Sequence, residues 1–203
     1  MEGGAGRIEC ALELPARTPC GIALLAHPHP LYGGAMDNKV VQMMARAFIQ
    51  LDYVTVRMNF RGVGSSQGTF AEGIGEAEDM RLVLAHMKKE YPGLPVALGA
   101  YSFGTYVTSH LLGLLESDGT PPDRTVLIAP TAGRWDLGTV PANTLVIHGE
   151  NDDLIPLGDV FKWARSLDLP VTVITGADHM YGRKLHHIVQ IIEGAFSKPA
   201  LPG

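Results

Sequence analysis

Hydrophobic positions along the chain follow two alternating patterns. Short segments that are apolar at nearly every position, or at every second one, indicate strands, and segments with apolar residues three or four positions apart indicate helices packed along one side. The expected strands cover residues 7–14, 21–26, 54–60, 96–100, 125–129, 144–147 and 171–174. The expected helices cover residues 37–51, with Asp37 as N-cap, and residues 74–89, 103–115, 157–166 and 185–196.

This alternation predicts an α/β fold, with a mostly parallel central sheet and helices on both of its faces. The first two strands are the expected exception, because the proline-bounded turn at residues 15–19 favours an antiparallel N-terminal pair. Cys10 and Cys20 lie in or beside these strands and could face each other across the hairpin. In a reducing compartment we expect them to be free thiols.

Composition and charge narrow the class of protein. A chain of 203 residues with 46% hydrophobic residues can bury a substantial core, which predicts a single domain over residues 1–203 with a disordered tail at 198–203. The net charge of −5 and the lack of a dense Lys or Arg run argue against a nucleic-acid partner. Without a signal-peptide core or an apolar run of membrane-spanning length, we expect a cytoplasmic protein without membrane contact, either monomeric or homodimeric.

Ser102 lies where an expected strand turns sharply into an expected helix, in the run Gly-Ala-Tyr-Ser-Phe-Gly at residues 99–104. Such a turn lifts a serine hydroxyl above the sheet and leaves nearby backbone amides free, as a nucleophile requires. Ala100 replaces the first glycine of the usual Gly-x-Ser-x-Gly pattern; the requirement there is steric, so alanine is the least disruptive replacement. The alternative is that Ser102 merely caps the helix.

Two further polar residues follow strands in the chain order that such a nucleophile needs. Asp152 lies in the loop after strand 144–147, and His179 lies in the loop after strand 171–174. The carboxyl ends of parallel strands meet at one edge of the sheet, which predicts a Ser102–His179–Asp152 triad there. The rival carboxylates, which the pattern does not exclude, are Glu150, Asp153 and Asp178.

Two additional segments extend this pattern over nearly the whole chain: Leu-Ala-His-Pro-His-Pro-Leu-Tyr-Gly-Gly at residues 25–34 and Arg-Met-Asn-Phe-Arg-Gly-Val-Gly-Ser-Ser at residues 57–66. With these segments and the three loops above, the chain resembles the α/β-hydrolase superfamily, in its small, lidless, dienelactone-hydrolase-like branch. The resemblance implies the triad roles and an oxyanion hole made by the amides of Phe103 and His29, with Leu31 as the alternative to His29. Dienelactone hydrolase uses a cysteine nucleophile, so the serine argues against the same reaction.

The connection between the strands at 125–129 and 144–147 is too short for the helical lid that many α/β-hydrolases carry. We therefore expect an open site with a shallow acyl pocket. Its candidate wall residues are Tyr32, Phe70, Phe103, Trp135, Met180 and Tyr181.

These features together predict a serine hydrolase that cleaves a small acyl ester through an acyl-enzyme, as a carboxylesterase does. The alternatives are a thioesterase or peptidase with the same triad, and a hydrolase-fold protein that binds without turnover, which Ala100 favours. We expect no cofactor and no metal. The pairs His27/His29 and His186/His187 could ligate a metal, but neither has a third ligand at motif spacing.

Overall fold

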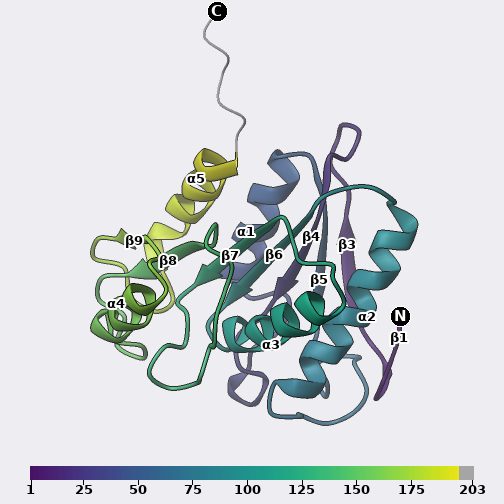
Figure 1. Cartoon of the computed structure of the whole chain (residues 1–203), viewed down its shortest axis with the longest axis horizontal. Helices are drawn as coiled ribbons and strands as arrows, with labels where there is room; N and C mark the ends of the chain where they lie inside the picture. Colours follow the sequence, from purple (N-terminus) through teal and green to yellow (C-terminus); the bar gives the residue numbers. More distant parts are fainter. Residues whose placement is uncertain (197–203) are drawn as a thin grey trace, which may run out of the picture.

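The structure is a computed structural model that describes residues 1–196, so the tail expected at 198–203 lies outside the described residues. Its centre is a seven-stranded sheet in the order β3-β5-β4-β6-β7-β8-β9 (Figure 1). The strands are β3 (Cys10–Glu13), β4 (Gly21–Ala26), β5 (Tyr53–Met58), β6 (Val96–Tyr101), β7 (Arg124–Ile128), β8 (Leu145–Gly149) and β9 (Val171–Ile174). Only β3 runs antiparallel to its neighbour, which confirms the expected α/β fold with a mostly parallel sheet.

Helices cover both faces of this sheet. The helices are α1 (Lys39–Gln50), α2 (Ile74–Glu90), α3 (Phe103–Ser117), α4 (Leu157–Ser166) and α5 (Leu185–Phe196). One core layer packs α2 and α3 against the sheet, and a second packs α1 and α5 against its other face (Figure 1). Helix α4 adds a smaller cluster beside β8. Outside the sheet lie two short helices, η1 (Pro30–Tyr32) and η2 (Gly182–Lys184), and a hairpin of β1 (Glu2–Gly3) and β2 (Gly6–Arg7).

The antiparallel pair is not the predicted one. β3 pairs with β5, with Cys10 opposite Met58, whereas β4 lies between β5 and β6 and is parallel to both. Because both edges of β4 are occupied, the segment at 14–20 carries the chain past β5 instead of closing a tight hairpin. The Cys20 thiol lies 3.2 Å from the Leu51 carbonyl oxygen, far from any hairpin partner, and both cysteines are free.

Helix α1 begins one residue later than predicted. Its N-cap is Asn38 and not Asp37, because the Asn38 side-chain oxygen accepts the Val40 amide hydrogen at 2.9 Å. That bond satisfies one of the four unpaired amides at a helix start. The remaining predicted helices and strands agree with the observed bounds to within a few residues.

The connection between β7 and β8, residues 129–144, contains no helix, so no lid domain is inserted there. It runs over the carboxyl edge of the sheet, the same edge that presents the loops after β4, β6, β8 and β9. Within residues 1–196, no helix combines the length and apolar character that crossing a membrane would need.

Candidate active site

Ser102 forms the sharp turn between β6 and α3. Its backbone lies at φ 53° and ψ −125°, a conformation that non-glycine residues rarely adopt and that surrounding structure must hold in place. Ser102 is the N-cap residue of α3, but its side chain makes no capping hydrogen bond, so capping does not explain why a serine stands here. The next glycine, Gly104, is sterically required, because a Cβ there would come within 2.7 Å of the Ala26 and His27 carbonyl oxygens. Ala100, at the other side of the turn, is fully buried without such a conflict.

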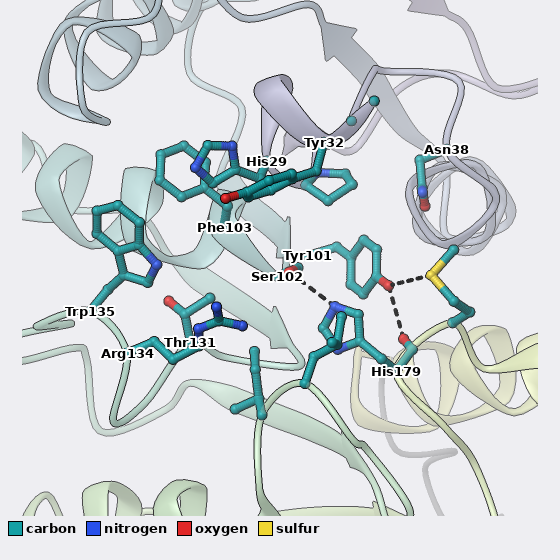
Figure 2. Close-up of a pocket in the computed structure, with 16 residues that line it drawn as sticks. His29, Tyr32, Asn38, Tyr101, Ser102, Phe103, Thr131, Arg134, Trp135 and His179 are labelled. Carbon is teal, nitrogen blue, oxygen red and sulfur yellow. Dashed lines mark hydrogen bonds between the residues drawn. The ribbon is translucent and has the colours of Figure 1, made fainter.

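The three residues expected from the sequence form one hydrogen-bonded chain. The Nε2 atom of His179 lies 3.1 Å from Ser102 Oγ (Figure 2). Its Nδ1 atom lies 2.7 Å from Asp152 Oδ2. His179 and Asp152 are buried, whereas the rival carboxylates Glu150, Asp153 and Asp178 are exposed and do not contact the imidazole. The loop after β8 therefore presents Asp152 alone to His179.

Asp152 is held as a carboxylate by its neighbours. Its Oδ1 atom accepts hydrogen bonds from the amides of Leu154 at 3.0 Å and Ile155 at 2.8 Å. Burial alone would raise the pKa of Asp152, but the hydrogen bonds from His179 and Ile155 and the nearby imidazoles outweigh it, so the pKa lies below its ordinary value. An ionised Asp152 accepts the Nδ1 hydrogen of His179, which leaves Nε2 with its lone pair toward the Ser102 hydroxyl.

His148 is a residue of this site that sequence reasoning missed. It is fully buried in β8, four residues before Asp152, and its Nε2 atom lies 2.9 Å from the Ile155 carbonyl oxygen and 3.7 Å from Asp152 Oδ2. Burial lowers the pKa of His148, so the ring is neutral and donates from Nε2 to Ile155. The ring thus supports the loop that carries Asp152. A single histidine inside an apolar strand offers no spacing signal that could have revealed this contact.

Tyr101, directly before Ser102, holds the histidine loop from the other side. Its hydroxyl donates to the His179 carbonyl oxygen at 2.8 Å, and the side chain is almost fully buried (Figure 2). Burial raises the pKa of the Tyr101 hydroxyl well above its ordinary value, so it remains a neutral donor. The strand that presents the serine is therefore tied to the backbone of the histidine.

The loop after β4 is fixed by His27. The buried His27 ring donates from Nδ1 to the Pro28 carbonyl oxygen at 2.6 Å and accepts the Phe60 amide hydrogen at Nε2, at 2.9 Å. Burial lowers the pKa of His27 to about 4, which keeps the ring neutral in this role. Since both ring nitrogens are engaged, His27 is not free to ligate a metal. Among residues 1–196 no three His, Cys, Asp or Glu side chains lie close enough together to hold a metal ion.

The amides expected to form an oxyanion hole both belong to residues that line the pocket beside Ser102. Phe103 begins α3, and neither its amide nor that of His29 has an acceptor within the described chain. The Leu31 amide, by contrast, donates to His29 Nδ1 at 3.3 Å. Its hydrogen is therefore already engaged, which favours His29 over Leu31.

A cavity of about 470 Å³ lies over the Ser102 hydroxyl. Of the expected wall residues, Tyr32, Phe103, Trp135 and Met180 line it. Phe70 stands behind the His29 ring, at 5.1 Å between ring centroids. Tyr181 was wrongly expected in the wall: its ring is fully buried below the site and its hydroxyl lies 3.4 Å from the Ile147 carbonyl oxygen, because its backbone at φ 58° turns the side chain inward.

Known proteins resemble this chain in sequence and in fold. The family model described as serine aminopeptidase, S33, matches residues 31–140, more than half of the chain. An uncharacterized protein of Rickettsia prowazekii, RP471, is 30% identical over 95% of this chain and 85% of its own length. A crystal structure of XC6422 from Xanthomonas campestris, described as an α/β serine hydrolase without a lid, is 34% identical and superimposes with a TM-score of 0.90 over 99% of this chain and 94% of that one.

A second solved structure, an α-β serine hydrolase homologue from Coxiella burnetii, is 29% identical with a TM-score of 0.87, over 97% of this chain and 95% of that one. These matches agree with the strained serine turn and the hydrogen-bonded Ser102, His179 and Asp152 side chains at the carboxyl edge of the sheet. The chain belongs to the serine aminopeptidase S33 family of the α/β-hydrolase superfamily and is a lidless serine hydrolase in type.

Proposed function

We propose that Ser102, His179 and Asp152 are the catalytic triad of an esterase that hydrolyses small acyl esters. The observation that carries the proposal is the unbroken chain from Asp152 Oδ2 through the His179 ring to Ser102 Oγ, which ends inside the pocket. A serine hydroxyl is almost entirely neutral near pH 7 and is a weak nucleophile without an adjacent base. The His179 Nε2 atom supplies that base within hydrogen-bonding distance.

The reaction follows from these positions. His179 accepts the Ser102 proton as Oγ attacks the ester carbonyl carbon, and the imidazolium then returns the proton to the departing alcohol. Asp152 keeps Nδ1 protonated and stabilises the imidazolium. A water molecule that is deprotonated by His179 hydrolyses the acyl-serine ester and restores the free hydroxyl.

The amides of Phe103 and His29 are proposed as the oxyanion hole. Both are without a protein acceptor in residues 1–196, and both residues line the cavity that contains the Ser102 hydroxyl. Donors aimed at the developing charge require no rearrangement during the reaction, and one such bond is commonly worth roughly 10²–10³ in kcat. The buried His27 supports this role, because it fixes the carbonyl of Pro28 directly before the His29 amide.

Small esters are favoured over large lipids because the pocket is open and the described part of the chain, residues 1–196, holds no lid domain over it. A thioester or peptide bond requires the same machinery, so the peptidase description of the family makes an amide substrate the second candidate. A binding protein without turnover would have no need for the strained Ser102 backbone or for an ionised Asp152 on His179.

The test is a comparison of 4-nitrophenyl butyrate, a butyryl thioester and an aminoacyl 4-nitroanilide as substrates. We expect turnover of the ester, and a fall of roughly 10⁴ or more in kcat for Ser102→Ala, as removal of a triad member costs elsewhere. Ser117→Ala on the exposed end of α3 is the matched control and should keep full activity. Turnover that survives in Ser102→Ala would refute the assignment, and anilide cleavage in preference to the ester would favour the peptidase.

A further inference from the structure

The cavity over Ser102 has one arginine in its lining. Among residues 1–196 this lining contains Arg134 and no aspartate or glutamate. Arg134 comes from the β7–β8 connection and points across the cavity toward Ser102 and His179, opposite Tyr32 and His29 (Figure 2). Arg134 is exposed to solvent, and its side chain borders the space that a substrate would fill.

The turn that carries Arg134 is held in place by the fold. The amides of Arg134 and Trp135 both donate to the Thr131 carbonyl oxygen at 3.1 Å, and the Thr131 amide donates to Thr105 Oγ1 on α3 at 3.2 Å. Gly133 lies at φ 79°, a left-handed conformation that lets the chain reverse before Arg134. The backbone of Arg134 is therefore held by a turn that is anchored on the helix that begins at the proposed nucleophile.

The Arg134 guanidinium has no acidic partner. Ion pairs in the described chain engage Arg17, Arg57, Arg61 and Arg81, whereas no carboxylate within residues 1–196 lies within 4.0 Å of Arg134. The Arg134 charge nevertheless acts on His29 across the cavity. Burial is the main cause of the lowered pKa of His29; the charge of Arg134 lowers this pKa further, and the charges of Glu72 and Glu76 raise it.

Aromatic side chains line the cavity beside Arg134 and across from it (Figure 2). The rings of His29 and Phe103 are 4.4 Å apart between centroids, and those of Phe103 and Trp135 are 5.3 Å apart. Such rings can pack against a flat apolar group, while a guanidinium binds the planar oxygens of a carboxylate or phosphate in a two-pronged manner. The rings and the guanidinium together suit a substrate with an apolar body and an anionic group.

We propose that Arg134 is a substrate-binding residue and that this pocket selects esters that carry a carboxylate or phosphate group. This proposal rests on the proposed esterase function and adds the charge of its substrate. It also separates this chain from an aminopeptidase, since the ammonium group of a free N-terminus would be repelled by Arg134 and would find no carboxylate among the residues that line the cavity.

The test uses pairs of esters of similar structure, one anionic and one neutral. On the alcohol side, 4-butyryloxybenzoate and 4-butyryloxyphenyl phosphate are compared with neutral methyl 4-butyryloxybenzoate. On the acyl side, 4-nitrophenyl hydrogen glutarate is compared with 4-nitrophenyl methyl glutarate. Each kcat/KM is divided by the hydroxide-catalysed rate of the same ester, so that differences in intrinsic reactivity cancel. Comparing the alcohol-side and acyl-side esters shows on which side of the ester the anion binds. Comparing 4-butyryloxybenzoate with 4-butyryloxyphenyl phosphate shows whether the site prefers a carboxylate or a phosphate.

We expect at least one anionic ester to exceed its neutral counterpart by about tenfold or more, the usual range for a charge-assisted hydrogen bond. In Arg134→Gln this ratio should fall close to one, and Arg134→Lys should retain part of it. Arg165→Gln on α4 is the matched control: it removes the same charge from an exposed site outside the cavity and should keep the ratio. The ratio should also decrease as ionic strength rises.

Equal or better turnover of the neutral esters, or an anion preference that persists in Arg134→Gln, would overturn the proposal. Calorimetric titration of 4-hydroxybenzoate into the wild type and Arg134→Gln gives a readout that does not depend on turnover. Saturable binding that Arg134→Gln abolishes supports the anion site even if no ester is cleaved, in which case the esterase function alone fails. Equal titration curves for the two proteins contradict the anion site.

Discussion

The base of the pocket and its mouth hold their polar side chains in different ways. At the base, Asp152, His148 and Tyr101 are buried, and each is hydrogen-bonded to a residue of the loop after β8 or the loop after β9. At the mouth, Tyr32 is 85% exposed and Arg134 has no acidic partner within residues 1–196. Buried bonds cost several kcal/mol to leave unmade, whereas exposed ones are exchanged for water at little cost. The base can therefore hold the reacting atoms in fixed positions, and side chains at the mouth can be substituted without displacing those atoms.

The largest expected effect comes from the buried carboxylate. Asp152→Asn should lower kcat by roughly 10⁴, because an amide can favour the wrong imidazole tautomer in His179. Asp153→Asn, next to it but exposed, should change kcat by less than about twofold. Steady-state kinetics with 4-nitrophenyl butyrate measure both. Equal losses in the two variants would mean that the loop after β8 presents its acid differently.

The second effect is a pH dependence of stability from His27. The folded pKa of about 4 lies below the ordinary value of 6.5, so between these values the unfolded chain binds a proton that the native ring does not. The free energy of unfolding should therefore decrease as pH falls through this window, by up to about 3 kcal/mol from this group. Urea unfolding at several pH values measures the slope.

His27→Gln should flatten this slope, and His29→Gln should flatten it much less, since His29 is only partly buried. The two variants compare a buried histidine at the start of the loop after β4 with a partly buried one at the mouth of the pocket. The same slope in the wild type and His27→Gln would show that the buried ring is not the group responsible.

A smaller effect on stability and activity is expected from Tyr101→Phe at the base of the pocket. The change removes the hydrogen bond to the His179 carbonyl oxygen and should lower the free energy of unfolding by about 1 kcal/mol, together with a loss of kcat smaller than that of Asp152→Asn. Tyr32→Phe at the exposed mouth is the control and should leave stability within about 0.5 kcal/mol of the wild type. If Tyr101→Phe and Tyr32→Phe lower the free energy of unfolding equally, the buried hydrogen bond of Tyr101 does not stabilise the fold more than an exposed hydroxyl does.

The smallest effect concerns the length of the acyl chain. Each methylene that is removed from water contributes about 0.8 kcal/mol, so kcat/KM for 4-nitrophenyl esters should rise by at most about fourfold per methylene and stop once the chain leaves the pocket. No increase is expected above the critical micelle concentration, because the described residues include no lid domain that could open. A steady rise to long-chain esters would indicate an apolar channel.

The parts of this structure that the sequence predicts well are those with a local signal. Ser102, Asp152 and His179 each follow a strand of the parallel sheet, so chain order and strand ends bring them to one edge. The alternation of apolar segments likewise predicts the elements themselves. Both patterns predict the fold well because strands that are buried on both faces can be arranged in few other ways.

The parts that the sequence does not predict depend on contacts between distant segments. β3 pairs with β5 and not with β4, the next strand along the chain, and no local pattern in the sequence of β3 indicates which strand it pairs with. His148 and Tyr181 have side chains that suit a core or a pocket wall equally well, and only the backbone direction decides between them. Arg134 shows the same limit, because the turn at residues 131–135 and its contact with α3 bring this residue to the cavity.

Labelling of the protein by a fluorophosphonate, followed by peptide mass spectrometry, tests the central claim most directly. The reagent phosphonylates a serine that an adjacent base activates. The account predicts one adduct per chain at Ser102, absent in Ser102→Ala and strongly slowed in Asp152→Asn. No adduct in the wild type, or an adduct on another residue that persists in Ser102→Ala, would contradict it.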